Sequence, residues 1–288
     1  MVVGEVVIDL AIHTDGTPCV VGHIGNEADV QRCFRIDPSS TRLWLRNTQR
    51  LTEDVVFQTS SAEEFRFSNM RVLSSSLTDE NGSLGLGFGS DVETHVRTSI
   101  MLTHNQMILD PQSPESLCHN NQLAAMLPVR RTQTGRNMES YDVEISLVSQ
   151  NDGTPFLSRG IRTGASSGEL TVSFEKTVIP ASMYSAINLA YQTLTGFPLS
   201  SESTQCTSIL NQLPAIKFSI SQRQISQAVD VVLFPEDYMH IDPVTGYCSP
   251  LLGETRSQHS YELGYNTLQN MNILLDYANN RIGFCDPI

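Results

Sequence analysis

The sequence predicts an all-β chain with a few short helices, and three observations lead to this fold class. Ser, Thr, Val, Ile and Leu recur in short runs, and Gly, Asn, Asp and Pro interrupt these runs at close intervals. Short, bounded runs of this kind are typical of strands. Blocks of helix-favouring residues are few. The 288 residues suffice for one large domain or for two lobes that each bury a sizeable core.

Short strands are expected along the first half of the chain. Apolar runs, several of them alternating, predict strands at residues 5–12, 19–24, 31–36, 54–58, 63–67 and 70–73. The glycine-rich run at 82–89 lacks the Gly-Lys-Ser/Thr ending of a phosphate-binding loop. We therefore expect it to contain a strand whose backbone approaches its neighbours closely.

The second half of the chain continues the pattern and contains one helix. Residues 141–148 alternate well and residues 169–174 read as a strand. Pro180 suits the first turn of a helix, and the apolar residues that follow recur at helical spacing, which indicates a core-facing stripe. The polar, basic stretch at 130–137 predicts a boundary between an N-terminal lobe, 1–135, and a C-terminal lobe, 136–288.

Composition and charge exclude several classes of partner. The formal net charge is −13 and the pI is about 4.9, so nothing would offset repulsion by the phosphates of nucleic acid or of an anionic membrane. No apolar run approaches the ~20 residues that span a bilayer, which argues against membrane insertion. The first residues lack a basic segment followed by a long apolar core, so no signal peptide is visible.

Six cysteines permit three disulfides and favour an oxidising compartment, the secretory pathway or the extracellular space. Cys19 and Cys33 flank one loop, and they are expected either to form a cross-strand disulfide or to remain two buried thiols. Cys19, His23 and Cys33 lack a fourth ligand at metal-binding spacing. We expect neither a metal site nor a cofactor.

The segment at 34–45 carries the clearest candidate for chemistry. An apolar strand delivers Asp37 to a turn of small residues, and the chain leaves through Leu43 and Trp44, the only tryptophan. The segment resembles the first active-site loop of pepsin-like aspartic proteases, which reads Asp-Thr-Gly-Ser-Ser-x-Leu-Trp. Here Pro38 stands for the Thr and Ser39 for the Gly.

The C-terminal part resembles the same family more specifically. Leu-Gly at 263–264 and Ala-Asn-Asn-x-Ile-Gly-Phe at 278–284 match the family's closing segments. The resemblance implies a bilobal pepsin-like fold over almost the whole chain. It also implies a disulfide between Cys206 and Cys248, which flank a Leu-Pro-x-Ile-x-Phe run at 213–218. Cys118 and Cys285 are left without an argument for their pairing.

The resemblance requires a second acid before the Pro180 helix, because these enzymes use two carboxylates that share one proton. Counting back without a gap places Thr171 at that position. Glu169 lies about 6–7 Å before it and Glu175 about 13 Å after it, at ~3.3 Å per extended residue. Ser39, Ser40 and Trp44 of the first loop and Ser173 of the second are expected to line the cleft.

Two further departures agree with a lost activity. The family carries a long hairpin flap with a tyrosine, whereas no tyrosine lies between Trp44 and Gly82, and only residues 47–52 join the first loop to the next strand. The family also has an Asp after the Leu-Gly pair, where this chain has Tyr265. The flap is therefore predicted to be truncated.

The sequence thus predicts a non-catalytic pepsin-like protein that binds a protein or peptide. One alternative is an active, atypical aspartic endopeptidase that uses Asp37 with Glu169 or Glu175. Another is a structural subunit of a larger assembly. In the non-catalytic interpretation Asp37 is a remnant whose carboxylate is satisfied by the hydroxyls of Ser40 or Thr41, and Trp44 packs the first lobe.

Overall fold

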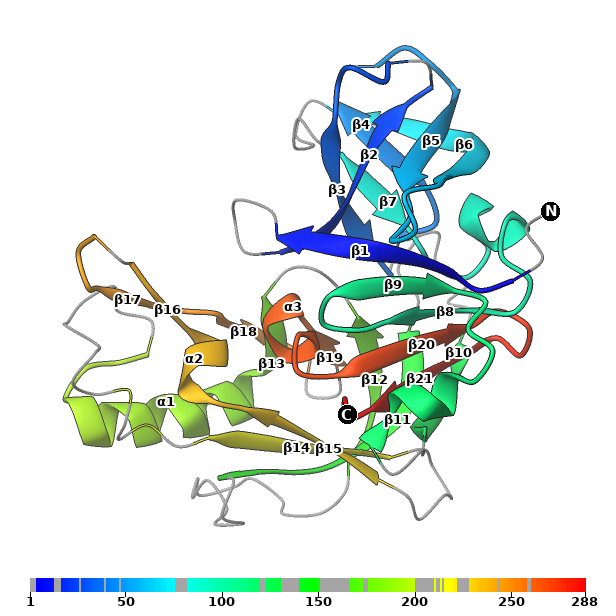
Figure 1. Cartoon of the computed structure of the whole chain (residues 1–288). Coiled ribbons are helices and arrows are strands. Elements are labelled where there is room, and N and C mark those ends of the chain that lie inside the picture. Colours follow the sequence, from blue (N-terminus) through cyan, green and yellow to red (C-terminus); the bar gives the residue numbers. More distant parts are fainter. Residues whose placement is uncertain are drawn as a thin grey trace. The chain divides into compact units, whose positions relative to one another are not determined.

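A computed structural model describes most of the chain and confirms the mostly β prediction with a few short helices (Figure 1). The described residues are 4–12, 17–25, 27–38, 40–46, 48–75, 82–119, 123–130, 140–150, 166–172, 176–199, 210, 213, 215–221, 228–242, 244–257 and 260–288.

The chain divides into two compact units. The first contains Met1–Ser140 together with Met271–Ile288, and the second contains Tyr141–Asn270. The expected N-terminal lobe, 1–135, and C-terminal lobe, 136–288, therefore need one correction. The last strands belong to the first unit, because β20 (Asn272–Asp276) pairs with β8 (Ser99–Leu102) and not with a strand of the second unit that the structure describes.

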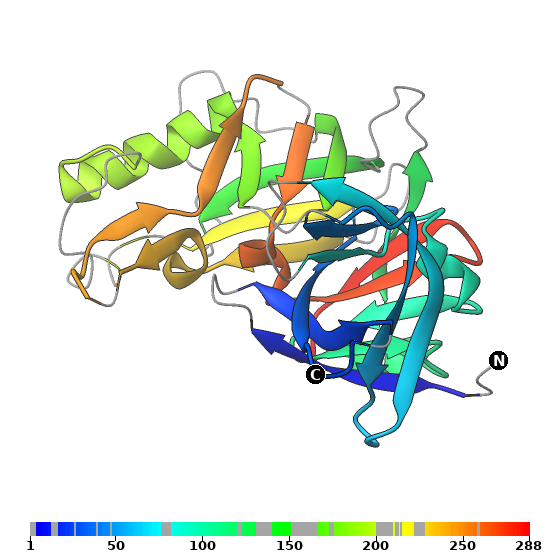
Figure 2. The ribbon, with the colours of Figure 1, turned by 90° about the horizontal axis from the view of Figure 1, so that it is seen from above.

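A closed barrel of six strands forms one part of the first unit (Figures 1 and 2). Neighbouring strands follow the order β2-β3-β7-β4-β6-β5, and β5 pairs with β2 to close the ring. The strands are β2 (Pro18–Ile24), β3 (Arg32–Asp37), β4 (Leu43–Arg46), β5 (Thr52–Gln58), β6 (Glu64–Ser75) and β7 (Ser83–Gly85). β3 with β7 and β4 with β6 are the parallel pairs.

Aromatic rings packed edge to face lie inside the barrel. Phe34, Phe57 and Phe67 are each at most 1% exposed. Phe57 meets Phe34 and Phe67 edge to face, with ring centroids 6.1 and 5.5 Å apart. Because edge-to-face pairs add to the free energy of burying the rings, this cluster stabilises the barrel that presents the first loop.

The β6 strand joins two segments that the sequence predicts as separate strands, 63–67 and 70–73. The break in the pattern corresponds to Asn69, which has φ 56°, opposite a register shift between Glu53 and Val55 of β5. Asn tolerates this left-handed conformation better than most residues, so a bulge interrupts the alternation without ending the strand.

An antiparallel sheet forms the other part of the first unit, with the order β1-β9-β8-β20-β21-β10. Its further strands are β1 (Val6–Ile12), β9 (Gln106–Leu109), β10 (Ala124–Arg130) and β21 (Arg281–Cys285). The short 3-10 helices η1 (Asp91–Thr94) and η2 (Pro114–Leu117) connect its elements. β1 continues into the barrel, where it pairs with β2.

The second unit is built on a mixed sheet with the order β15-β14-β11-β12-β19-β13-β18. These strands are β11 (Ser140–Gln150), β12 (Ser166–Val172), β13 (Thr177–Pro180), β14 (Ile216–Ser221), β15 (Ala228–Leu233), β18 (Leu252–Thr255) and β19 (Ser260–Leu263). A hairpin of β16 (Met239–Ile241) and β17 (Cys248–Pro250) and the short helices α2 (Pro235–Tyr238) and α3 (Tyr265–Leu268) complete it.

The predicted helix after Pro180 is α1 (Ala181–Thr195). Pro180 caps its N-terminus with φ −53°, and Gly196 ends it with φ 79° in the left-handed region that suits glycine. Ala186, Ile187 and Tyr191 form its buried stripe. The helical spacing read from the sequence therefore marks a core-facing side.

Candidate functional site

Asp37 is the last residue of β3, where the chain turns toward β4. It lies opposite Gly85 of the parallel strand β7. Its backbone carbonyl accepts the N–H groups of Leu86 at 2.8 Å and Ser40 at 3.3 Å. Its side chain is half-buried. The barrel thus fixes the backbone of this acid both across the sheet and within the turn.

The hydroxyl of Ser40 organises the turn that follows Asp37. Ser40 is 7% exposed, and its Oγ accepts the indole N–H of Trp44 at 3.0 Å and the backbone N–H of Arg42 at 3.3 Å. The same hydroxyl donates to the Arg42 carbonyl at 3.4 Å. The expected bond from the hydroxyl of Ser40 or Thr41 to the Asp37 carboxylate stays a prediction. Ser39 lies outside the described residues.

Two glycines of the predicted glycine-rich run let the backbone approach the first loop. A Cβ atom on Gly85 would lie 2.5 Å from the Arg42 nitrogen and 2.6 Å from the carbonyl oxygens of Arg42 and Ser40. A Cβ atom on Gly87 would lie 2.9 Å from the Ser40 oxygen. The nitrogens of Gly85 and Gly87 instead donate to Arg42 and Ser40 at 3.0 and 2.7 Å. The expected close approach of this strand is confirmed.

Tyr277, which sequence reasoning did not select, also supports the first loop. Its hydroxyl donates to the Leu86 carbonyl at 2.6 Å, although the two residues are 191 positions apart. Its ring contacts Phe88 with centroids 5.3 Å apart. No local pattern signals this contact, because it depends on the C-terminal strands entering the first unit.

The corresponding loop of the second unit follows β12. Thr171 lies opposite Glu262 of the parallel strand β19, and its hydroxyl donates to the Tyr261 carbonyl at 3.3 Å. The backbone of Glu169 lies opposite Ser260. Ser173 and Glu175 lie outside the described residues.

A buried polar network anchors the chain where it enters β13. The Thr177 hydroxyl donates to Asn266 Oδ1 at 2.8 Å, accepts the Gly264 N–H at 3.0 Å and contacts the Thr267 hydroxyl. The Asn266 amide in turn donates to the Asp237 carbonyl at 2.9 Å. Thr177, Asn266 and Thr267 are at most 5% exposed, so their mutual bonds offset the cost of burying polar groups.

Comparison with known proteins gives the fold its context. No protein-family model matches the chain, and no curated protein matches it. Among solved structures, the chain is similar to basic 7S globulin from soybean, with a TM-score of 0.66 at 12% sequence identity. The match covers 98% of this chain and 96% of that one. The chain has a pepsin-like fold.

Within this pepsin-like fold, a short connection follows the first loop. β4 ends at Arg46 and β5 begins at Thr52, so only residues 47–51 separate the two strands. The following hairpin is β5 with β6, which belongs to the barrel itself because β5 pairs with β2. A long hairpin between β4 and β5 has no residues from which to form.

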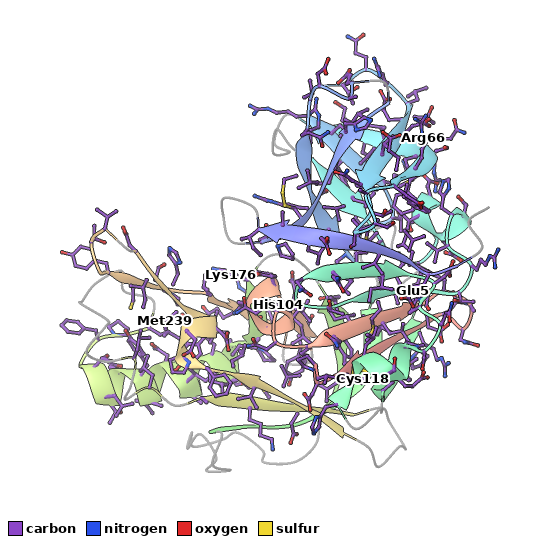
Figure 3. The ribbon with its side chains drawn as sticks, in the orientation of Figure 1. Glu5, Arg66, His104, Cys118, Lys176 and Met239 are labelled. Atoms are coloured by element: carbon purple, nitrogen blue, oxygen red, sulfur yellow. A yellow bond between two sulfur atoms is a disulfide. The ribbon has the colours of Figure 1, made fainter. Side chains whose placement is uncertain are left out.

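Disulfides join the described cysteines of the pepsin-like fold. Cys19 and Cys33 are bonded across β2 and β3 with their Cα atoms 5.3 Å apart, which resolves the alternative of two free thiols. Cys118 is bonded to Cys285 (Figure 3), a pairing for which the sequence offered no argument. Cys248 is disulfide-bonded, and its predicted partner, Cys206, lies outside the described residues.

Disulfides are typical of an oxidising environment such as the secretory pathway or the extracellular space, which supports that part of the localisation prediction. No helix in the described part of the chain is long and apolar enough to cross a membrane. Within that part, no group of three or more His, Cys, Asp or Glu residues is arranged to hold a metal ion.

Proposed function

We propose that this chain is a non-catalytic protein with a pepsin-like fold that binds a protein or peptide partner without cleaving it. Aspartic proteolysis needs two carboxylates that share one proton, one acting as the base toward water and the other as the acid. Asp37 supplies the first. The proposal depends on which residue occupies the position of the second.

Strand register supports the absence of a second acid, and this observation carries the proposal. Both units contain a strand that runs parallel to a strand carrying a Leu-Gly pair: β3 beside β7 with Leu84-Gly85, and β12 beside β19 with Leu263 before Gly264. Asp37 lies opposite Gly85, and Val172 lies opposite Leu263. The equivalent of Asp37 is by this count the residue after Val172, which is Ser173.

Strand register places Ser173 at the position of the second acid, whereas counting back from Pro180 in the sequence places Thr171 there. Both residues carry a hydroxyl. A hydroxyl with an ordinary pKa neither activates a water as a carboxylate does nor shares a proton with Asp37. Removing one positioned acid or base alone typically lowers a rate by ~10²–10⁴. The sequence between Trp44 and Gly82 supports the same proposal, because it contains no tyrosine, whereas the family's flap carries one as it closes over a substrate and excludes water.

A cleavage assay tests the proposal. The purified chain is incubated with denatured protein substrates from pH 2 to 7, and the products are analysed by mass spectrometry beside an active pepsin-like protease. We expect no cleavage above the buffer control and no effect of a peptide inhibitor that mimics the transition state. Cleavage that the inhibitor blocks and that Asp37→Ala abolishes would instead support the atypical endopeptidase, with Glu169 or Glu175 as the second acid.

A further inference from the structure

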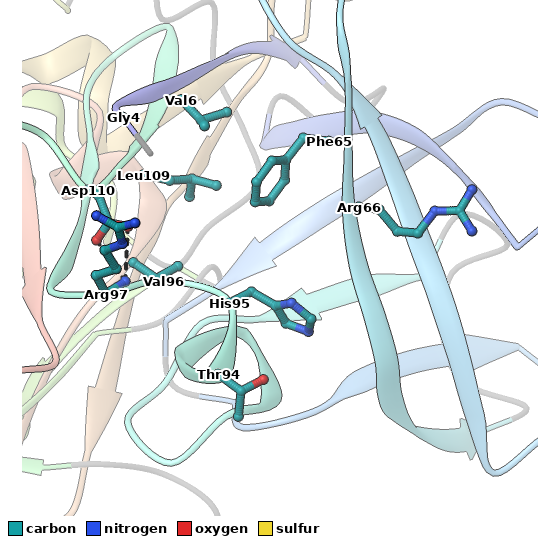
Figure 4. Close-up of a pocket in the computed structure, with 10 residues that line it drawn as sticks. All are labelled: Gly4, Val6, Phe65, Arg66, Thr94, His95, Val96, Arg97, Leu109 and Asp110. Atoms are coloured by element: carbon teal, nitrogen blue, oxygen red, sulfur yellow. Dashed lines mark hydrogen bonds between the residues drawn. The ribbon is translucent and has the colours of Figure 1, made fainter. Parts of the chain in front are cut away.

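A cavity of about 480 Å³ opens on the first unit where β1, β6, β9 and the segment after η1 meet (Figure 4). It is lined by Gly4, Val6, Phe65, Arg66, Thr94, His95, Val96, Arg97, Leu109 and Asp110. None of these residues belongs to the loop that carries Asp37. This volume lies within the range of ~300–1,000 Å³ that is usual for pockets that hold small ligands.

The base of the cavity is apolar. Val6, Val96 and Leu109 are at most 9% exposed, and the half-buried ring of Phe65 lies near them (Figure 4). An apolar group that enters the cavity would exchange contact with water for contact with these four side chains. Such burial is the main favourable contribution to binding in pockets of this kind.

The charged groups at the rim are not equivalent. The guanidinium of Arg66 is engaged by Asp54, with an Nη1–Oδ2 distance of 3.2 Å, and it points away from the other lining side chains in Figure 4. Arg97 is exposed, and its guanidinium forms no ion pair with any residue that the structure describes. The guanidinium of Arg97 is therefore available to pair with a ligand, whereas that of Arg66 already has an ion-pair partner.

The one carboxylate at the rim is already engaged by the backbone. Asp110 Oδ1 accepts the N–H groups of Arg97 and Thr98 at 2.8 and 2.7 Å, and Oδ2 accepts the Arg97 N–H at 2.9 Å. These bonds hold both carboxylate oxygens on the backbone, and Asp110 forms no ion pair with the Arg97 guanidinium. His95 contributes a ring whose Nε2 lies 3.0 Å from the Ser68 carbonyl and therefore carries a proton.

We propose that this cavity binds an apolar group that carries a carboxylate, with the apolar part against Val6, Val96 and Leu109 and the carboxylate at Arg97. Two sources share this chemistry: the C-terminal residue of a peptide and a free amphipathic acid. This proposal goes beyond the proposed function. The residues of the cavity are separate from the loop of Asp37, and ligand binding there does not depend on whether the protein is catalytic.

Titration of the whole protein with N-acetyl-phenylalanine, followed by NMR of ¹⁵N-labelled backbone amides, tests the proposal. We expect saturable shifts at the amides of Val96, Arg97 and Leu109. N-acetyl-phenylalaninamide, which lacks the carboxylate, should bind about tenfold more weakly, because charge-assisted hydrogen bonds are about twice as strong as neutral ones. Equal binding of acid and amide, or shifts confined to other residues, would overturn the proposal.

Two matched arginine variants distinguish a specific contribution of Arg97 from the nonspecific effect of removing a positive charge near the cavity. Arg97→Gln should weaken binding of the acid about tenfold and leave binding of the amide unchanged, whereas Arg66→Gln should leave both unchanged. An equal loss in the two variants would contradict the assignment. A pentapeptide ending in phenylalanine and free phenylacetate then identify the source: tighter binding of the peptide indicates a peptide C-terminus, and equal binding indicates a free acid.

Discussion

Ser40 connects three parts of the first loop through one hydroxyl. It holds the indole of Trp44 and both backbone groups of Arg42, and its carbonyl accepts the N–H of Gly87. The motif at 34–45 was sufficient to select Ser40 and Trp44 from the sequence. Their hydrogen bonds to each other were not predictable, because the sequence pattern does not define which way a hydroxyl points.

Replacing Ser40 tests this role at the level of one residue. In Ser40→Ala, the indole N–H of the half-buried Trp44 loses its acceptor, and loss of a typical hydrogen bond costs about 0.5–1.5 kcal/mol. We expect the free energy of unfolding in urea to fall by that amount, with a changed fluorescence of Trp44, the only tryptophan. Ser74→Ala on β6, where the serine is exposed, is the matched control and should change stability by less than ~0.5 kcal/mol. Equal stability of the two variants would refute this role of Ser40.

The pairing of strand β3 with strand β7 sets the geometry of the first loop. Because Gly85 lies against the backbones of Ser40 and Arg42, this pairing depends on the absence of a side chain at position 85. The sequence predicted this close approach from a run of glycines. It did not predict the additional hydrogen bond from Tyr277. This residue follows β20 and is 191 positions away from its partner, Leu86.

Gly85→Ala tests the tolerance of this element. The added methyl group would lie within 2.6 Å of three backbone atoms that have no freedom to move aside, so we expect a loss of at least ~3 kcal/mol or failure to fold. Gly4→Ala is the control, because no atom lies within 4 Å of its Cβ position. Thermal unfolding and the yield of soluble protein give the comparison. A Gly85→Ala protein as stable as Gly4→Ala would refute the close packing.

Local patterns predicted most elements, and long-range pairing explains where they failed. The alternation at 141–148 and the helix after Pro180 were read correctly, because both are periodic over several residues. The strand β6 was divided in two because the bulge at Asn69 shifts the phase of the alternation. The predicted place of Met271–Ile288 in the second lobe was wrong because β20 pairs with β8. This pairing is a long-range contact that no local sequence pattern signals.

At the scale of the molecule, the Cys118–Cys285 disulfide fastens the C-terminal strand to the first unit. It lies among the buried residues Met101, Ile108 and Leu274, and it joins positions 167 residues apart. Cys19–Cys33 closes a separation of only 14 residues. In the chain-entropy model, a bond that closes a longer loop restricts the unfolded chain more and stabilises the fold more.

Paired serine variants test this difference. Replacing Cys118 and Cys285 by serine should lower the free energy of unfolding by about 2–5 kcal/mol. The corresponding change at Cys19 and Cys33 should cost roughly 2 kcal/mol less, because the cost scales with the logarithm of loop length. Urea unfolding of both variants measures the two losses. A larger loss at Cys19–Cys33 would contradict the importance of the long-range bond.

The central proposal, that the chain binds peptides without cleaving them, has a direct thermodynamic test. Two peptides of the same sequence are compared by calorimetry, one with an ordinary peptide bond and one with a hydroxyl-bearing mimic of the tetrahedral intermediate at the central position. A working pair of carboxylates binds such mimics 10²–10⁸-fold more tightly than substrates. We predict an affinity ratio near one, unchanged by Asp37→Asn. A ratio above ~100 that Asp37→Asn removes would contradict the account and establish a functional dyad.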